Sequence, residues 1–519
     1  MKLSDKAHAL IGVSLMVPFY LVWILGYLNA IPLTLYKALE MALSIMFIIG
    51  LAILLLPIAH KIINLTRKDR YFLAIIILMT LFIILGVSLS YVKYLAYDAY
   101  AWDLGIFMQA LFSTAFYHKL LYYTVELFMN PSGSFLGAHF SPILFTLVPI
   151  YYLYPHSITL LAIQAVLLYT PVMPLYLIAL RLTHNESIAF ITSLMYLLSP
   201  GVASPLYFDF HVEVFIPLLY IVTVLFIIMR RWVLVMVSLI LFLMIIEYTP
   251  IIALMMIIPI IYMLIKDREL SKYVMYVILM FVIIILYILI IPRVMGLINP
   301  YKSSLAVYNP STIAGYSGNP INFIQYAVKY WVFVKLSILD NIQQKIMYYV
   351  ILGAPLFPAF LSPLWLLPAM PYTVFSLLST YAPYYTLNFQ YTMYVVPQLF
   401  IAYVMGIGRV KRYIKHILIS SLIISLILYA LYNPLSPAAP QNLYVFIWHL
   451  NSTRVKALNS IIKLIPSNAS VLTTNSVFPH LANRLDAYVF PMSTPNYDEY
   501  VLSINATYIL MTISSRGSI

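Results

Sequence analysis

The 519-residue sequence contains no cysteine, and only 9% of its residues are charged. The absence of cysteine excludes disulfide-stabilised folds, thiolate metal sites and cysteine nucleophiles. The scarcity of charge excludes an ordinary soluble enzyme, because soluble domains carry about 25% charged residues. In contrast, 63% of the residues are hydrophobic, and the mean hydropathy is +0.96. We therefore expect lipid to surround most of this chain.

Long apolar stretches define the expected fold class. Stretches of about 20 apolar residues with few charges predict helices that cross a bilayer. We predict thirteen of them, so the chain is expected to be an all-α polytopic membrane protein. They cover residues 8–28, 38–60, 71–92, 157–180, 186–200, 212–229, 232–247, 250–265, 273–292, 346–361, 363–380, 391–407 and 416–432.

Short basic connections predict how these helices are oriented. The positive-inside rule puts them in the cytoplasm and the N-terminus inside. This topology accounts for the net charge of +13, so no nucleic-acid partner is expected. The basic connections are residues 60–70, Arg181, and residues 230–231, 266–272 and 409–415.

The stretch 232–265 is too long for one crossing. As a single helix it would be about 50 Å long, whereas the hydrocarbon core of a bilayer is about 30 Å thick. We predict two short helices with a turn at Glu247-Tyr248-Thr249-Pro250.

Two parts make up the predicted domain organisation. Residues 1–432 form the transmembrane domain, with external loops at 93–156 and 293–345. The chain loses its hydrophobicity after residue 432, so residues 433–519 are expected to form a small external α/β domain. Within it we predict an amphipathic helix over 443–465 and strands at 469–474 and 486–490, with further strands near residues 500 and 508.

The few acidic residues of the external loops are candidate functional residues. Asp98 and Asp103 follow the third predicted span. Asp98 is equally well explained as part of a solvated loop. Asp103 opens a helix in apolar surroundings, where an unpaired carboxylate is costly unless it is used or capped.

A second acidic cluster is Asp209, His211 and Glu213, between the fifth and sixth predicted spans. In an extended segment these alternating positions point the same way and would suit a divalent cation, Mg or Mn, or acid–base chemistry. The alternative is structural: Asp209 caps the sixth helix and Glu213 complements its N-terminal dipole.

Three further residues are expected on the same side. His139 stands before Phe140-Ser141-Pro142, where a satisfied interfacial histidine is the plainer interpretation. Glu247 is a carboxylate within a long apolar stretch, which makes it a functional candidate. Arg293 is one of the external cations that would suit a lipid phosphate.

The motifs as a set resemble a family of archaeal and bacterial multi-spanning membrane proteins of unknown function. The resemblance runs from about residue 75 to 512. It rests on Asp103-Leu104-Gly105-Ile106-Phe107-x-Gln109, His139-Phe140-Ser141-Pro142, Phe210-His211-x-Glu213, Gln390-Tyr391, and the tail motifs Pro479-His480-Leu481-Ala482-Asn483-Arg484 and Tyr488-Val489-Phe490-Pro491.

That family is similar to the GT-C class of membrane glycosyltransferases. The resemblance implies a sugar donor linked to polyprenyl phosphate, with membrane lipids as further partners. Asp103 would stand in the place of the acidic residue in the first external loop and act as the catalytic base. Residues expected to bind substrate are Asp98, Gln109, His139, Glu247, Gln390 and Arg293, and the tentative metal ligands are Asp209, His211 and Glu213.

Two other functions stay open from the sequence. The chain is alternatively a transporter or flippase of lipid-linked saccharides or envelope lipids, or a non-catalytic envelope assembly protein. For each of them we expect a multi-pass protein of the cell membrane with its C-terminal domain outside. The sequence predicts no oligomeric state.

Overall fold

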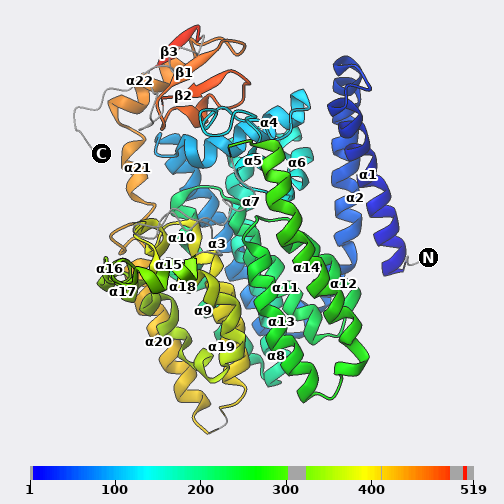
Figure 1. The fold of residues 1–519 in the computed structure, drawn as a ribbon, viewed down its shortest axis with the longest axis vertical. Coiled ribbons are helices and arrows are strands. Elements are labelled where there is room, and N and C mark those ends of the chain that lie inside the picture. Colours follow the sequence, from blue (N-terminus) through cyan, green and yellow to red (C-terminus); the bar gives the residue numbers. More distant parts are fainter. Residues whose placement is uncertain (1–3, 302–322, 411, 491–505, 511–519) are drawn as a thin grey trace.

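The computed structural model describes residues 4–301, 323–410, 412–490 and 506–510. Helices dominate these residues and run side by side, and a small sheet lies at one end of them (Figure 1). In that view the strands lie at the upper end of the helices.

Within the described residues, nine helical segments are long and apolar enough to cross a membrane. Three of these nine segments each contain two successive elements. The nine are α1 (Asp5–Tyr27), α2 (Leu33–Lys68), α3 (Arg70–Leu95), α7 with α8 (Ser157–Tyr169 and Val172–Thr183), α9 with α10 (Glu186–Leu198 and Pro200–Phe208), α13 (Thr249–Lys266), α14 (Leu270–Ile298), α17 with η6 (Ile342–Gly353 and Ala354–Leu361) and α20 (Ile414–Tyr432).

The other four predicted spans coincide with shorter helices, so the count of thirteen stays a prediction. Three of them join a short 3-10 segment to an α-helix, and the fourth is the single short helix α12. They contain η3 with α11 (Val212–Val214 and Phe215–Ile228), α12 (Trp232–Leu243), η7 with α18 (Pro363–Ala369 and Met370–Leu378), and η9 with α19 (Gln390–Tyr394 and Val396–Ile407). The predicted division of 232–265 into two helices is confirmed, because α12 and α13 are separated by residues 244–248.

The segment between α3 and α7 forms short elements over the end of the bundle. The apolar piece around residues 140–154 is broken, as its prolines predict. These elements are η1 (Ala101–Gly105), α4 (Ile106–Tyr117), α5 (Phe135–Ala138), η2 (Pro142–Thr146) and α6 (Val148–Leu153). The later loop contributes α15 (Phe323–Lys329) and α16 (Trp331–Leu339), and η8 (Ala382–Tyr385) precedes η9.

The chain after α20 forms a small α/β unit. Its three strands, β1 (Val471–Thr473), β2 (Ala487–Val489) and β3 (Tyr508–Leu510), form a parallel sheet in the order β2-β1-β3. The predicted helix over 443–465 is wrong as one helix. It divides into α21 (Val445–His449) and α22 (Thr453–Ile462), because Ser452 caps α22 through Val455 N. The short η10 (Phe478–His480) lies between β1 and β2, and the strand predicted near residue 500 lies outside the described residues.

Candidate functional site

The site is built around Asp103, which lies in η1 between the end of α3 and the start of α4. The residue is 8% exposed, although it belongs to a connection. Its Oδ1 lies 3.5 Å from Nε2 of His211, a residue of the connection between α10 and α11. The fold therefore brings together an acid and a base that are far apart in the sequence.

Burial changes the protonation of this pair. It raises the pKa of Asp103 well above its ordinary value, and the nearby negative charge of Asp209 raises it further. Burial lowers the pKa of His211 to about 3, so its imidazole is neutral at pH 7. Asp103 is thus a stronger base than an exposed aspartate, and no cation offsets its charge at contact distance within the described part of the chain.

A buried ion pair lies next to Asp103. Lys93, in the last turn of α3, places its Nζ 2.9 Å from Oδ1 of Asp209 and 2.6 Å from the carbonyl of Phe208. The backbone N–H of Tyr100 donates to the other oxygen of Asp209 at 3.2 Å. Burial raises the pKa of Asp209 to about 6, although Lys93 opposes this shift. The pair holds the connection after α10 against the segment that carries Asp103.

A second acid–histidine pair lies on the α5–η2 side. Nδ1 of His139 lies 2.8 Å from Oε1 of Glu247, and the backbone N–H of Phe140 donates to Oε2 at 2.9 Å. Glu247 is fully buried in the turn between α12 and α13. The predicted hairpin thus places this carboxylate at helix ends.

Aromatic rings connect the two pairs. The ring of Phe107 lies 5.4 Å from that of His211 and 5.0 Å from that of Phe135. The ring of Phe135 is in turn 5.9 Å from that of His139. Aromatic rings of α4 and α5 therefore connect His211 of the α10–α11 connection with His139 after α5, so the two acid–histidine pairs belong to one cluster.

Oxygen atoms of Glu213 and Gln390 are among the buried polar atoms of this region that lack a hydrogen-bond partner within the described residues, as is Nδ1 of His211. Tyr394 donates to Oε1 of Glu213 at 3.3 Å, but Oε2 of Glu213 is buried without a partner. Oε1 of Gln390, at the start of η9, is likewise buried and unpartnered. Since buried polar atoms are normally satisfied, these two oxygens are available to a ligand.

The predicted cation site at Asp209, His211 and Glu213 is not supported by the arrangement. The three side chains turn to different partners: Lys93, Asp103 and Tyr394. Among the residues that the structure describes, no group of three His, Asp or Glu side chains is arranged to hold a metal ion. The predicted cap is also absent, because Val214 rather than Asp209 occupies the N-cap of α11.

Three other predicted site residues lie outside the cluster. Asp98 accepts a hydrogen bond from Nδ1 of His449 at 2.9 Å, which ties it to α21. Gln109 is fully buried in α4, and both ends of its amide are used in contacts with backbone groups and Thr124. Arg293 is exposed on α14 and forms no ion pair with a described carboxylate.

Two residues of the site were not predicted from the sequence. Lys93 was not singled out, although a lysine directly after an apolar span is placed to meet a buried acid. Tyr394 gave no signal, because its partner Glu213 is 181 residues away in the chain.

The comparisons with known proteins identify a family. Residues 93–518 match the model of the family described as "Predicted membrane protein (DUF2079)". The match covers most of the chain, so this protein belongs to that family. It leaves out α1, α2 and most of α3. A search of curated proteins finds no match.

Proposed function

We propose that this member of the DUF2079 family is a membrane glycosyltransferase that uses a sugar linked to polyprenyl phosphate. The observation that carries the proposal is the buried Asp103, 3.5 Å from a neutral His211, in a connection that begins directly beyond α3. A carboxylate with a raised pKa at this place suits a general base that acts on an acceptor hydroxyl.

The transfer step follows from this assignment. The acceptor oxygen attacks the anomeric carbon of the donor sugar, and the new glycosidic C–O bond forms as the bond from that carbon to the phosphate oxygen breaks. The acceptor proton passes to the carboxylate of Asp103, and polyprenyl phosphate leaves with the bonding electrons. His211 positions the carboxylate of Asp103, while the free oxygens of Glu213 and Gln390 suit hydroxyl donors of the sugar.

The place of the charged residues favours transfer over transport. Asp103, Asp209, His211 and Glu247 lie in connections between helices. Transporters instead place ionisable residues near the middle of discontinuous spans. Charged residues at helix ends suit a reaction between a lipid-linked donor and an acceptor outside the bilayer, the side on which we also propose the C-terminal unit.

The test is the substitution Asp103→Asn in the full-length protein. We expect transfer from polyprenyl phosphate-linked [¹⁴C]mannose or [¹⁴C]glucose to fall about 10²–10⁴-fold, because the amide cannot accept the proton. The melting temperature should stay within the range of the unmodified protein. Asp340→Asn, a change of the same kind at the end of α16, should leave transfer unaffected. Full activity of Asp103→Asn would reject the mechanism.

A further inference from the structure

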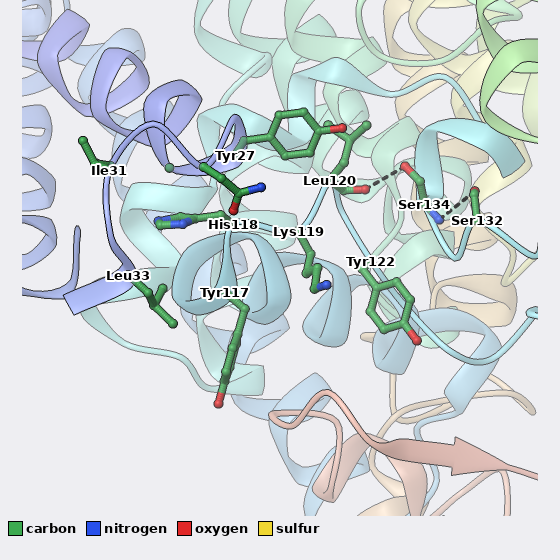
Figure 2. A pocket seen from close by; sticks show the side chains of 12 residues that line it. Tyr27, Ile31, Leu33, Tyr117, His118, Lys119, Leu120, Tyr122, Ser132 and Ser134 are labelled. Carbon is green, nitrogen blue, oxygen red and sulfur yellow. Dashed lines mark hydrogen bonds between the residues drawn. The ribbon is translucent and has the colours of Figure 1, made fainter. Parts of the chain in front are cut away.

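A second site lies away from Asp103, between the α1–α2 turn and the segment after α4. It is a cavity of about 460 Å³, within the range of ligand pockets. Figure 2 shows side chains of both segments around it, with Tyr27, Ile31 and Leu33 from the first and Tyr117, His118, Lys119 and Tyr122 from the second. Leu120, Ser132 and Ser134 are the other labelled residues of its wall.

The lining has a positive character. Lys119 contributes an exposed ammonium group that forms no ion pair with a described carboxylate, and none of the lining residues is acidic. A second ammonium, that of Lys37, lies 5.4 Å from the ring centre of Tyr117. An anion in this cavity would thus meet the ammonium group of Lys119, with that of Lys37 behind the Tyr117 wall, and no carboxylate on the lining.

His118 supplies a buried polar group at the same place. The residue is 8% exposed and lines the cavity, and its Nε2 is buried with no hydrogen-bond partner among the described residues. Burial and the charge of Lys37 lower the pKa of His118, so the ring is neutral at pH 7. In the tautomer with its proton on Nε2, the ring offers one unused N–H donor.

Two backbone features make room for the His118 ring beside the cavity. His118 ends α4 in the left-handed conformation, with φ of 53°. Gly26 makes room for its ring, since a Cβ at this glycine would lie 2.4 Å from Cε1 of His118. The end of α1, at Gly26, and the end of α4 therefore both contact the imidazole of His118.

The cavity lies where bilayer headgroups are expected. Its first wall is the turn that joins α1 to α2, and both helices are long and apolar enough to cross a membrane. Tyr27, Tyr117 and Tyr122 line the cavity, and tyrosine is enriched at the membrane–water interface. We therefore expect the phosphate layer of a bilayer at this depth.

We propose that this cavity binds a phosphate group, supplied by the headgroup of a membrane phospholipid, with Lys119 and His118 as its polar contacts. The bound headgroup joins the α1–α2 hairpin, which lies outside the family match, to the segment that follows α4. The site is independent of the proposed transferase activity.

The test measures lipid binding to the full-length protein in detergent by native mass spectrometry. The probes are phosphatidylglycerol, diacylglycerol with the same acyl chains, and inorganic phosphate as a competitor. We expect phosphatidylglycerol to be retained at least tenfold better than diacylglycerol. Lys119→Gln should weaken its retention about tenfold, the loss expected for one hydrogen bond to a charged group.

Two further variants make the result specific. Leu33→Trp fills the cavity from an exposed position and leaves Lys119 in place, so it should also reduce retention. Lys456→Gln removes an exposed lysine of α22, away from the cavity, and should bind as the unmodified protein does. Competition by millimolar inorganic phosphate would support phosphate recognition and point to a soluble source. Equal retention of diacylglycerol, or unchanged binding by both Lys119→Gln and Leu33→Trp, would overturn the proposal.

Discussion

At the scale of single residues, burial and the negative charge of its neighbour Asp209 determine the pKa of Asp103. Both raise its pKa, so the carboxylate takes up a proton at a higher pH than an exposed aspartate does. A general base must be ionised, so transfer should be lost as the pH falls through this raised pKa and be retained above it. The acid limb of kcat/KM should therefore lie above the ordinary pKa of aspartate, about 3.9.

Asp209→Asn tests the origin of this limb. The substitution removes a negative charge beside Asp103 and leaves Lys93 unneutralised, and both changes lower the pKa of Asp103. The acid limb of the profile should move to lower pH. A limb that stays in place or moves to higher pH would show that Asp103 is not the group that titrates.

The ion pair of Lys93 and Asp209 has its own consequence for stability. Its side chains are 4% and 2% exposed, so removal of one partner leaves a buried charge. Lys93→Met should destabilise the protein by about 3–5 kcal/mol, measured by thermal unfolding in detergent. Lys335→Met, at an exposed lysine of α16, is the control and should change little. The double variant Lys93→Met with Asp209→Asn should recover part of the loss, and its failure to do so would contradict this account.

At the scale of elements, α1 and α2 pack closely through glycine. A Cβ at Gly50 would lie 2.6 Å from the carbonyl oxygen of Gly12, and one at Gly12 would lie 2.7 Å from that of Gly50. Gly50→Ala should therefore push the two helices apart and cost about 1–3 kcal/mol.

The same substitution at another glycine provides the control. A Cβ at Gly353, near the end of α17, meets nothing within 4 Å. Gly353→Ala should keep or slightly raise the melting temperature, whereas Gly50→Ala should lower it. Equal melting temperatures of the two variants would show that α1 and α2 do not approach each other as closely at Gly50 as the structure indicates.

The sequence predicted the positions of the helices better than the tertiary contacts between them. Apolar length located the long helices, because a bilayer demands about 20 apolar residues regardless of neighbours. The excess length of 232–265 and its charged turn predicted the separation of α12 from α13, and hence the place of Glu247. The length of the apolar stretch could not show that the span predicted at 391–407 begins within the irregular η9. This depends on contacts with residues far away in the sequence, such as those of Thr392 with Gly201 and of Tyr394 with Glu213.

The candidate site could be predicted only in part for the same reason. Asp103 and Glu247 were noticed because acids are rare in an apolar chain. Their partners His211 and His139 come from other connections, and no spacing in the sequence couples them. The alternation of Asp209, His211 and Glu213 predicted a common face, but contacts with three separate elements turn their side chains apart.

At the scale of the whole molecule, the C-terminal unit rests on the segment that carries Asp103. The ring of His480 stacks between those of Tyr94 and Tyr97, at 4.1 and 3.9 Å, and Nε2 of His480 lies 3.0 Å from the carbonyl of Tyr94. The backbone N–H of Ala101 donates to the side chain of Asn475 at 2.8 Å. The sheet and the site are thus parts of one packed structure, which explains why the family match runs through both.

Gln109 is the central polar contact of this docking. Its amide nitrogen donates to the carbonyls of Arg484, Leu485 and Ala487 at 3.1–3.2 Å, and its oxygen accepts from the backbone N–H of Thr124 at 2.9 Å. Gln109→Leu would leave these buried groups without their partner, which costs about 1–3 kcal/mol for each unsatisfied group. The β2 strand should then loosen from α4.

Hydrogen exchange distinguishes this loosening from a general loss of stability. Amides of residues 484–489 should exchange faster in Gln109→Leu, while those of α7 to α9 should keep their rates. Gln344→Leu, at an exposed glutamine whose side chain bonds only to Thr386 within the described chain, should leave the exchange of 484–489 unchanged. Unaltered protection of β2 in Gln109→Leu would mean that apolar contacts such as Phe478 against Gly105 hold the C-terminal unit without this amide.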